Sequence, residues 1–254
     1  MLQKQIFKKY LPFFTLYFLL WIIFFEFFFP SNTILPRPSI VLESFAPLWE
    51  FYHLPQNFLI TFCSIYFSLI AGFFAVKLLA NFLFRGKSFI KDFLLSLGSF
   101  SEYIPGIVLA LFLIIWFPNS VVVEFILSFL VAFFLILDKA ARLSSNLYQP
   151  YLDSTKSFGT STDVINKEVA WKSILPELKK YILEIHIYLW TILISFEIIK
   201  GNTGLGSVFK NALAFKDLSS LFAAALITGV VIFLIIHLLK FFLNKMIHWS
   251  EIEF

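Results

Sequence analysis

Charged residues and cysteine are both scarce in this 254-residue sequence. Only 14% of the residues are charged, whereas 59% are hydrophobic and 20% are aromatic, and the mean hydropathy is +0.86. Water-soluble domains usually contain about 25% charged residues, so this chain has too few to cover a soluble surface. The single cysteine, Cys63, excludes an intrachain disulfide. The composition therefore indicates a folded chain surrounded by a lipid bilayer.

Catalytic and metal-binding motifs are also missing. None of the four histidines forms an H-x-x-x-H pair, and one cysteine adds no metal-ligand spacing. Gly86-Lys87-Ser88 resembles the end of a phosphate-binding loop, but Asn81 occupies the position of its first glycine. No serine lies in a G-x-S-x-G setting. We therefore expect no enzymatic activity, metal or cofactor in this chain, so uphill transport would need a partner or an ion gradient.

Six apolar runs have the length of a membrane-spanning helix. They are Tyr10–Phe29, Phe58–Val76, Phe93–Phe117, Val121–Leu137, Tyr181–Ile199 and Leu221–Leu239. The first run is too long and too aromatic for a cleaved signal peptide. The sequence predicts an all-α integral membrane protein of about six transmembrane helices, forming a single domain over residues 1–254.

The basic residues are distributed unequally between the connecting segments. Sixteen of the 20 lysines and arginines lie before the first run, between the second and third, between the fourth and fifth, or after the sixth. The other four are Arg37, Lys200, Lys210 and Lys216. By the positive-inside rule, both termini are cytoplasmic. The net charge of +4 then reflects topology, and we expect no nucleic-acid partner.

Three connecting segments are long enough to form structure of their own. Pro30–Gln56 contains five prolines and predicts an extended external loop with one short surface helix. Lys139–Pro176 is the largest cytoplasmic segment, and apolar residues among its charges predict short amphipathic helices. Gly201–Asp217 is external and predicts a glycine-rich turn that leads into a short surface helix.

Several polar residues fall at membrane depth, where ionisable groups are costly and usually functional. Glu184 and His186 lie in the first turns of the fifth run, and Glu197 lies near its outer end. Interfacial snorkelling is an alternative explanation for Glu184. Glu197 is either a gate residue or a carboxylate that braces the following glycine turn. Sequence alone does not separate these two roles.

The third run is interrupted by residues that disfavour a continuous helix. Glu102, Pro105 and Gly106 lie in its middle, together with Gly98, Ser99 and Ser101. Broken helices line cavities in transporters, because freed backbone groups need water or protein partners. A proline kink is the competing explanation.

Five short segments occur in an order that resembles one known family. They are Leu35–Leu42, Tyr103-Ile104-Pro105, Asp153–Gly159, Ile174-Leu175-Pro176, and Phe196-Glu197 followed by Gly204-Leu205-Gly206. The ordered set, over about Leu35 to Trp249, resembles the permease subunits of ATP-binding-cassette importers in the nitrate/sulfonate/taurine branch. Asp153–Gly159 is similar to the E-A-A-x-x-x-G cytoplasmic loop of that family, and Glu197 with Gly204 and Gly206 is similar to its A-E…G-L-G segment.

The sequence departs from the family pattern at three places. Ala110 replaces a common second proline, and Asp153-Ser154-Thr155 replaces Glu-Ala-Ala. The stretch from Gly159 to Pro176 is about one helical turn longer than usual. An alternative register starts at Ser157 and leaves Asp163 in place of the loop glycine. The coupling loop has therefore diverged in either register.

The resemblance implies a type I importer permease in the bacterial cytoplasmic (inner) membrane. Its implied partners are a cytoplasmic ATPase dimer, an external substrate-binding protein, a second permease chain, most simply an identical one, and membrane lipid. The implied ATPase-coupling residues are Asp153, Ser154, Thr155, Gly159 and Pro176. The pathway or gate candidates are Glu102, Pro105, Glu184, His186, Glu197, Gly204 and Gly206.

The substrate and two other functions stay open at this point. The family transports small polar organic anions, sulfonates or nitrate, whereas acidic residues at membrane depth favour neutral or cationic nitrogenous substrates. One rival function is a secondary transporter driven by protons through Glu184, His186 and Glu197. The other is a membrane scaffold or receptor that does not transport.

Overall fold

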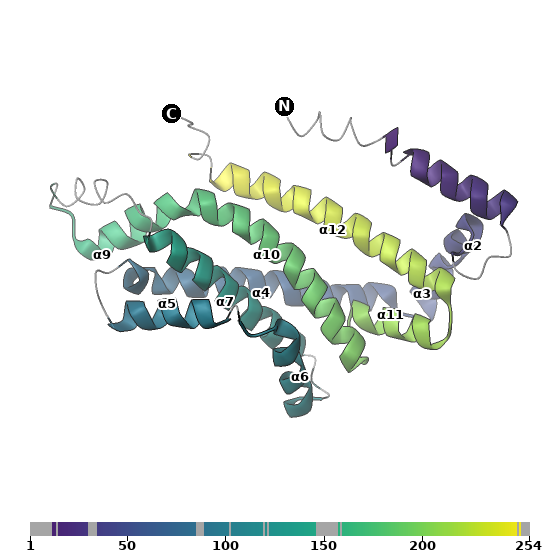
Figure 1. Cartoon of the computed structure of the whole chain (residues 1–254), viewed down its shortest axis with the longest axis horizontal. Coiled ribbons are helices and arrows are strands. Elements are labelled where there is room, and N and C mark those ends of the chain that lie inside the picture. The colour runs from purple at the N-terminus through teal and green to yellow at the C-terminus, as the bar shows by residue number, and fades with distance from the viewer. Residues whose placement is uncertain are drawn as a thin grey trace. The chain divides into compact units, whose positions relative to one another are not determined.

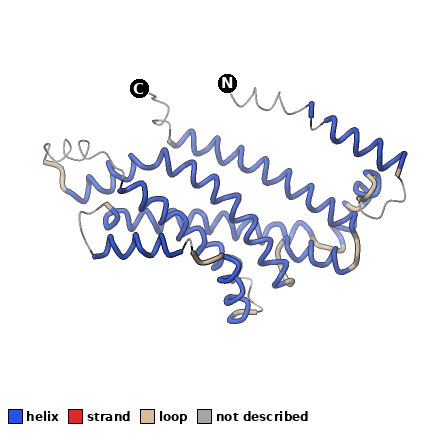
Figure 2. Tube along the Cα trace, viewed as in Figure 1, coloured by secondary structure: helices blue, strands red, loops and turns tan. Residues whose placement is uncertain are grey.

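The described part of the chain is built from helices. The computed structural model describes residues 12–13, 15–29, 35–84, 89–101, 103–118, 120, 122–145, 157, 159–247 and 249. Within these residues every regular element is a helix (Figure 2). The predicted all-α class is therefore confirmed for this part of the chain.

Figure 1 labels most of these helices along the chain. In chain order they are an apolar helix at Thr15–Phe28 that ends in the π-helical η1 (Ile23–Phe28), α2 (Pro38–Glu43), α3 (Phe45–Glu50), α4 (Leu54–Leu83), α5 (Phe89–Ser101), α6 (Gly106–Trp116), α7 (Val122–Ser145), α9 (Thr162–Val164), the π-helical η2 (Ile165–Ala170), α10 (Trp171–Lys200), α11 (Leu205–Ala214) and α12 (Leu218–Met246).

Among the described residues, three helices are long and apolar enough to cross a membrane: α4, the helix over Glu168–Lys200, and α12. This finding confirms the expectation of a membrane protein, while the count of six spans stays a prediction. The helix at Thr15–Phe28 and α6 are apolar but shorter. Helix α7 is also long and largely apolar, but it contains four charged residues, Glu124, Asp138, Lys139 and Arg142.

The third predicted span is broken rather than kinked. Helix α5 ends at Ser101 and α6 begins at Gly106, so Tyr103 and Ile104 belong to neither helix. Pro105 caps α6, where its missing N–H costs no helical hydrogen bond. The predicted interruption is confirmed, and the proline-kink alternative is wrong.

Three predictions about the bounds or number of helices differ from the structure. Helix α10 begins at Trp171, ten residues before the predicted start at Tyr181, and Pro176 lies inside it. Elements α9, η2 and α10 follow without a gap, so one continuous rod replaces the separate short helices predicted before Pro176. The segment Pro30–Gln56, which is predicted to be external, contains two short helices, α2 and α3, instead of one. Prolines are tolerated there because they lie in the first turns, as Pro38 does in α2.

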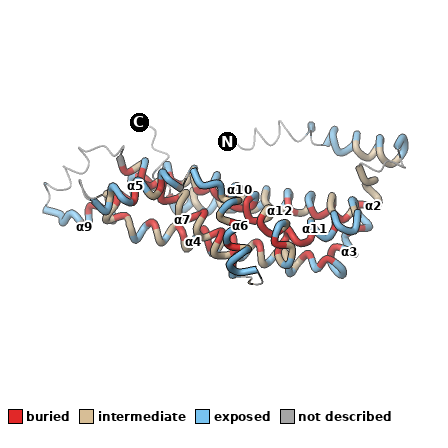
Figure 3. Tube along the Cα trace, turned by 60° about the horizontal axis from the view of Figure 1, so that its bottom comes forward, coloured by how far each residue is buried: buried red, intermediate tan, exposed pale blue. Residues whose placement is uncertain are grey.

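The described residues group into two compact units. One unit comprises residues 57–207 and 231–254, and within it α7 packs against both α5 and α10. Its interior contains fully buried apolar side chains such as Leu127, Ile136 and Leu189. Buried positions alternate with exposed ones along α10 (Figure 3), as expected for a helix that contacts protein on one side.

The other unit comprises residues 1–56 and 208–230. Here Trp21 contacts Phe222, and the Tyr52 hydroxyl donates to Asp217 at 3.1 Å. Burial together with the hydrogen bond and charge of Asp217 raises the pKa of Tyr52 to about 12. Burial acts to raise the pKa of Asp217, but hydrogen bonds from Ser220, Ser219 and Tyr52 outweigh it and hold this pKa below its ordinary value. This contact links the loop before α4 to the loop before α12.

Candidate functional site

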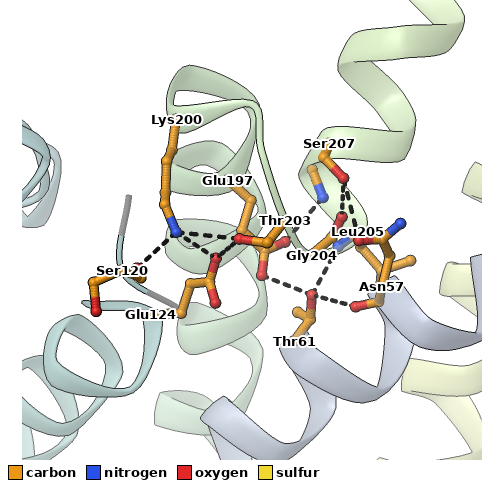
Figure 4. A network of polar contacts seen from close by, with 11 residues as sticks. Asn57, Thr61, Ser120, Glu124, Glu197, Lys200, Thr203, Gly204, Leu205 and Ser207 are labelled. Atoms are coloured by element: carbon orange, nitrogen blue, oxygen red, sulfur yellow. Dashed lines mark hydrogen bonds and ion pairs between the residues drawn. The ribbon is translucent and has the colours of Figure 1, made fainter. Parts of the chain in front are cut away.

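A buried polar cluster lies where α10 ends (Figure 4). Its members come from α4, α7, α10 and the turn before α11: Thr61, Glu124, Glu197, Lys200 and Thr203. We call these five residues the end cluster. Both carboxylates are fully buried. Because charged groups are costly to bury without partners, the contacts of each member show what the cluster does.

Glu197 caps the start of α11. One of its carboxylate oxygens accepts the backbone N–H of Gly206 at 2.9 Å, and the other accepts the Thr61 hydroxyl at 2.7 Å. The first N–H groups of a helix have no partner within the helix, and they carry the positive end of its dipole. A buried carboxylate at this position satisfies one of these groups and interacts favourably with the dipole.

Thr61 completes the cap from α4. Its hydroxyl oxygen accepts the backbone N–H of Leu205 at 2.8 Å and lies 3.2 Å from the carbonyl of Asn57. The Ser207 hydroxyl lies 3.4 Å from the Asn57 side-chain oxygen. The first turn of α11 is therefore held by hydrogen bonds to residues of α4 that are far away in the sequence.

Two glycines make this close approach possible. Gly204 has φ +80°, and a Cβ there would lie 2.1 Å from the Glu197 carboxyl carbon. A Cβ on Gly206 would lie 2.4 Å from the Glu197 Cβ and 2.5 Å from the Ile194 carbonyl oxygen. Contacts this short are impossible for real side chains. Glycine is therefore required at both positions if Glu197 is to cap α11.

Lys200 forms a buried ion pair with Glu124. Its Nζ lies 3.1 Å from the Glu124 carboxylate, 2.9 Å from the Ser120 carbonyl and 3.1 Å from the Thr203 hydroxyl. These three acceptors match the three N–H donors of an ammonium group. The Thr203 hydroxyl also contacts the oxygen of Glu124 that Lys200 contacts, while the other Glu124 oxygen has no hydrogen-bond partner in the part of the chain described.

His186 lies apart from this cluster, between α4 and α10. The Trp190 indole donates to His186 Nε2 at 3.1 Å, and the Tyr66 hydroxyl lies 2.5 Å from the same nitrogen. Since an indole N–H can only donate, Nε2 must accept, which places the proton of a neutral ring on Nδ1. The Tyr66 ring also contacts the His186 ring, with 5.6 Å between the ring centroids. These contacts give His186 a packing role in this conformation.

The structure brings together only part of the predicted site. Glu197, Gly204 and Gly206 meet at the α11 cap, and Pro105 begins α6. Glu184 is exposed on α10.

The predicted coupling residues are only partly described. Gly159 is an exposed turn residue with φ +74°, and Pro176 lies within α10. Four predicted residues lie outside the described residues: Glu102, Asp153, Ser154 and Thr155.

Sequence analysis does not identify four members of the end cluster as candidates: Thr61, Glu124, Lys200 and Thr203. Glu124 pairs with Lys200 across 76 positions, and Thr61 meets Glu197 across 136 positions, so no local motif links them. Lys200 was counted as an external base in a loop, whereas its side chain is buried. The available signal was Glu124 itself, an acidic residue in an apolar run that needs a partner.

No protein-family model, curated protein sequence or solved structure matches the chain. The described residues also contain no group of three or more His, Cys, Asp or Glu side chains that could hold a metal ion. The end cluster is therefore interpreted from its own geometry. It acts as a clamp that joins the ends of α4, α7, α10 and α11 through hydrogen bonds and one ion pair.

Proposed function

We propose that this chain is the transmembrane permease subunit of an ATP-binding-cassette importer. Two copies would enclose a substrate pathway in a bacterial cytoplasmic membrane. A separate cytoplasmic ATPase dimer would drive the change between inward-open and outward-open states, and an external binding protein would deliver the substrate. The chain would supply the pathway and the coupling segment but no catalytic group.

The observation that carries this proposal is the continuous rod from Thr162 to Lys200. Elements α9, η2 and α10 comprise 3, 6 and 30 residues, so at about 1.5 Å per residue the path along their helix axis is about 58 Å. The hydrocarbon core of a bilayer is about 30 Å thick. Such a rod is long enough to cross the membrane and to project well beyond it, towards the predicted ATPase side.

The projecting end of the rod is packed against α4, which makes it suitable for transmitting force. Trp171 is buried, and its ring centroid lies 5.7 Å from that of Phe73. The side-chain amide of Asn166 donates a hydrogen bond to the side-chain oxygen of Asn81 at 3.4 Å. Gly159, with φ +74°, lies at the exposed turn before the rod. An ATPase that moved the segment around Gly159 would therefore tilt a supported helix rather than a loose loop.

The opposite end of the same rod belongs to the end cluster. There Glu197 caps α11 and Lys200 holds Glu124 of α7. Tilting the rod would consequently shift the starts of two other helices that lie on the predicted external side. A two-state arrangement of this kind is what alternating access requires, because the ATPase must stabilise one state more than the other.

The proton-driven alternative has weaker geometric support. It needs a relay through Glu184, His186 and Glu197. Glu184 is exposed, His186 is bonded to Tyr66 and Trp190, and Glu197 is bonded to Thr61 and Gly206. The three groups occupy separate surroundings, so proton transfer between them would require a different conformation.

Purification of the chain from its native membrane tests the proposal. We expect an ATP-hydrolysing subunit to co-purify at one copy per permease chain, and ATP rather than a proton gradient to support uptake in vesicles. Uptake that persists without any ATPase and collapses with an uncoupler would favour the proton-driven transporter. An intact chain that binds no ATPase and moves no substrate would favour the scaffold.

A further inference from the structure

A groove between α10 and α12 has basic residues at one end. It encloses about 520 Å³, and its lining includes Lys179, Lys180, Lys240 and Asn244. These side chains lie in the first third of α10 and the last third of α12. Both segments border the side of the membrane that the distribution of basic residues predicts to be cytoplasmic.

The other end of the groove is apolar. Leu183 and Ile187 line it from α10, and Ile236 lines it from α12. These residues follow the α10 lysines by one to two turns and precede Lys240 by one turn, so they lie about 5–10 Å deeper along the helices. The groove therefore changes from cationic to apolar in the direction that leads from the membrane surface to its interior.

The charge of the groove stays positive when its acidic neighbours are included. Glu184 also lines the groove, between Leu183 and Ile187 on α10. Glu177 contacts Lys180 at 3.0 Å, but both side chains are more than half exposed. Exposed ion pairs of this kind are weak, and Lys180 can exchange Glu177 for another anion at little cost. Lys180 and Lys240 outnumber Glu184, which is the one carboxylate in the lining, so the groove attracts a negative group.

We propose that this groove holds one anionic phospholipid. Its phosphate would lie against Lys180, Lys240 and Asn244, and the upper part of one acyl chain would lie against Leu183, Ile187 and Ile236. Zwitterionic lipids would bind less well because their own cation opposes the lysines. The proposal concerns a lipid site on the outside of the helices and does not depend on what the chain transports.

Native mass spectrometry of the purified full chain tests this site. The chain is titrated with phosphatidylglycerol or with phosphatidylcholine that has the same acyl chains. An interfacial lysine contributes about fivefold in affinity, so two should give a preference of about 30-fold for phosphatidylglycerol. Lys180→Gln with Lys240→Gln should remove this preference. Lys180→Arg with Lys240→Arg should keep it, because the positive charges remain.

A matched control changes two lysines elsewhere on the same predicted side. Lys77→Gln with Lys91→Gln removes the same charge outside the groove and should alter the preference by less than about threefold. If the Lys77 and Lys91 variant lost the preference for phosphatidylglycerol to the same extent, general surface charge would explain the preference, and the proposal would be overturned. Equal affinity of the parent for both lipids, or displacement of phosphatidylglycerol by equimolar inorganic phosphate, would also overturn it.

Discussion

The buried ion pair between Lys200 and Glu124 makes a strong prediction about stability. Lys200→Met keeps most of the side-chain volume but removes all three donated hydrogen bonds. Glu124 would then be a fully buried carboxylate without a counter-charge, and one of its oxygens already has no partner among the described residues. Removing one partner of a buried pair costs about 3–5 kcal/mol. Because 1 kcal/mol corresponds to about 2–4 °C in a chain of this size, the melting temperature should fall by about 10 °C.

Two further variants separate a lost ion pair from a general packing defect. Glu124→Gln combined with Lys200→Met removes both charges and should recover more than half of the lost stability, because no uncompensated charge remains. Lys210→Met removes an exposed lysine from α11 and should change stability by less than about 0.5 kcal/mol. Thermal unfolding in detergent, followed by tryptophan fluorescence, gives all three values. A loss below about 1 kcal/mol for Lys200→Met would refute the interpretation of the pair.

Three other predictions follow from the packing of single residues. Gly206→Ala should lower the free energy of unfolding by about 1–3 kcal/mol, because its Cβ would overlap the Glu197 Cβ. Gly229→Ala is the control and should be neutral or stabilising, because no atom lies within 4 Å of its Cβ. Equal effects of the two substitutions would disprove the close approach of Gly206 to Glu197. Glu197→Ala should lower the free energy of unfolding by about 1–2 kcal/mol because the α11 cap is lost, and Glu197→Gln should lower it less. Reduced uptake per folded molecule in both variants would instead support a gate role for Glu197. Because the pKa of Asp217 is lower in the folded state, its ionised carboxylate stabilises the fold above the unfolded-state pKa, and stability should fall as the pH drops below about 4. Asp217→Asn should flatten this loss in a series of melting temperatures measured at different pH values. A pH profile identical to that of the parent would contradict this role of Asp217.

The sequence predicted the features that depend on local pattern. Continuous apolar runs located α4, α10 and α12, because a span needs length and hydropathy more than specific partners. Pro105 indicated the interruption between α5 and α6, since proline lacks a donor. The glycine turn after Glu197 indicated the site of the α11 cap.

The features that depend on distant pairing could not be predicted in this way. Glu124 and Thr61 have their partners on α10, far along the chain, and no spacing rule connects them. Lys200 is a basic residue that follows the predicted fifth span, so the sequence places it in a connecting loop. Its burial follows only from the acceptors that surround it, which come from two other segments of the chain.

The most direct test of the proposed permease function is the amount of ATPase bound to the purified chain. We predict one ATP-hydrolysing subunit per parent chain. Gly159→Val should reduce this amount several-fold, because φ +74° is unfavourable for a β-branched residue at the turn before the rod. Gly229→Ala should leave it unchanged, since that glycine lies in α12 with open space around it. A parent chain that is folded, inserted in its native membrane and free of any ATP-hydrolysing subunit would contradict the account.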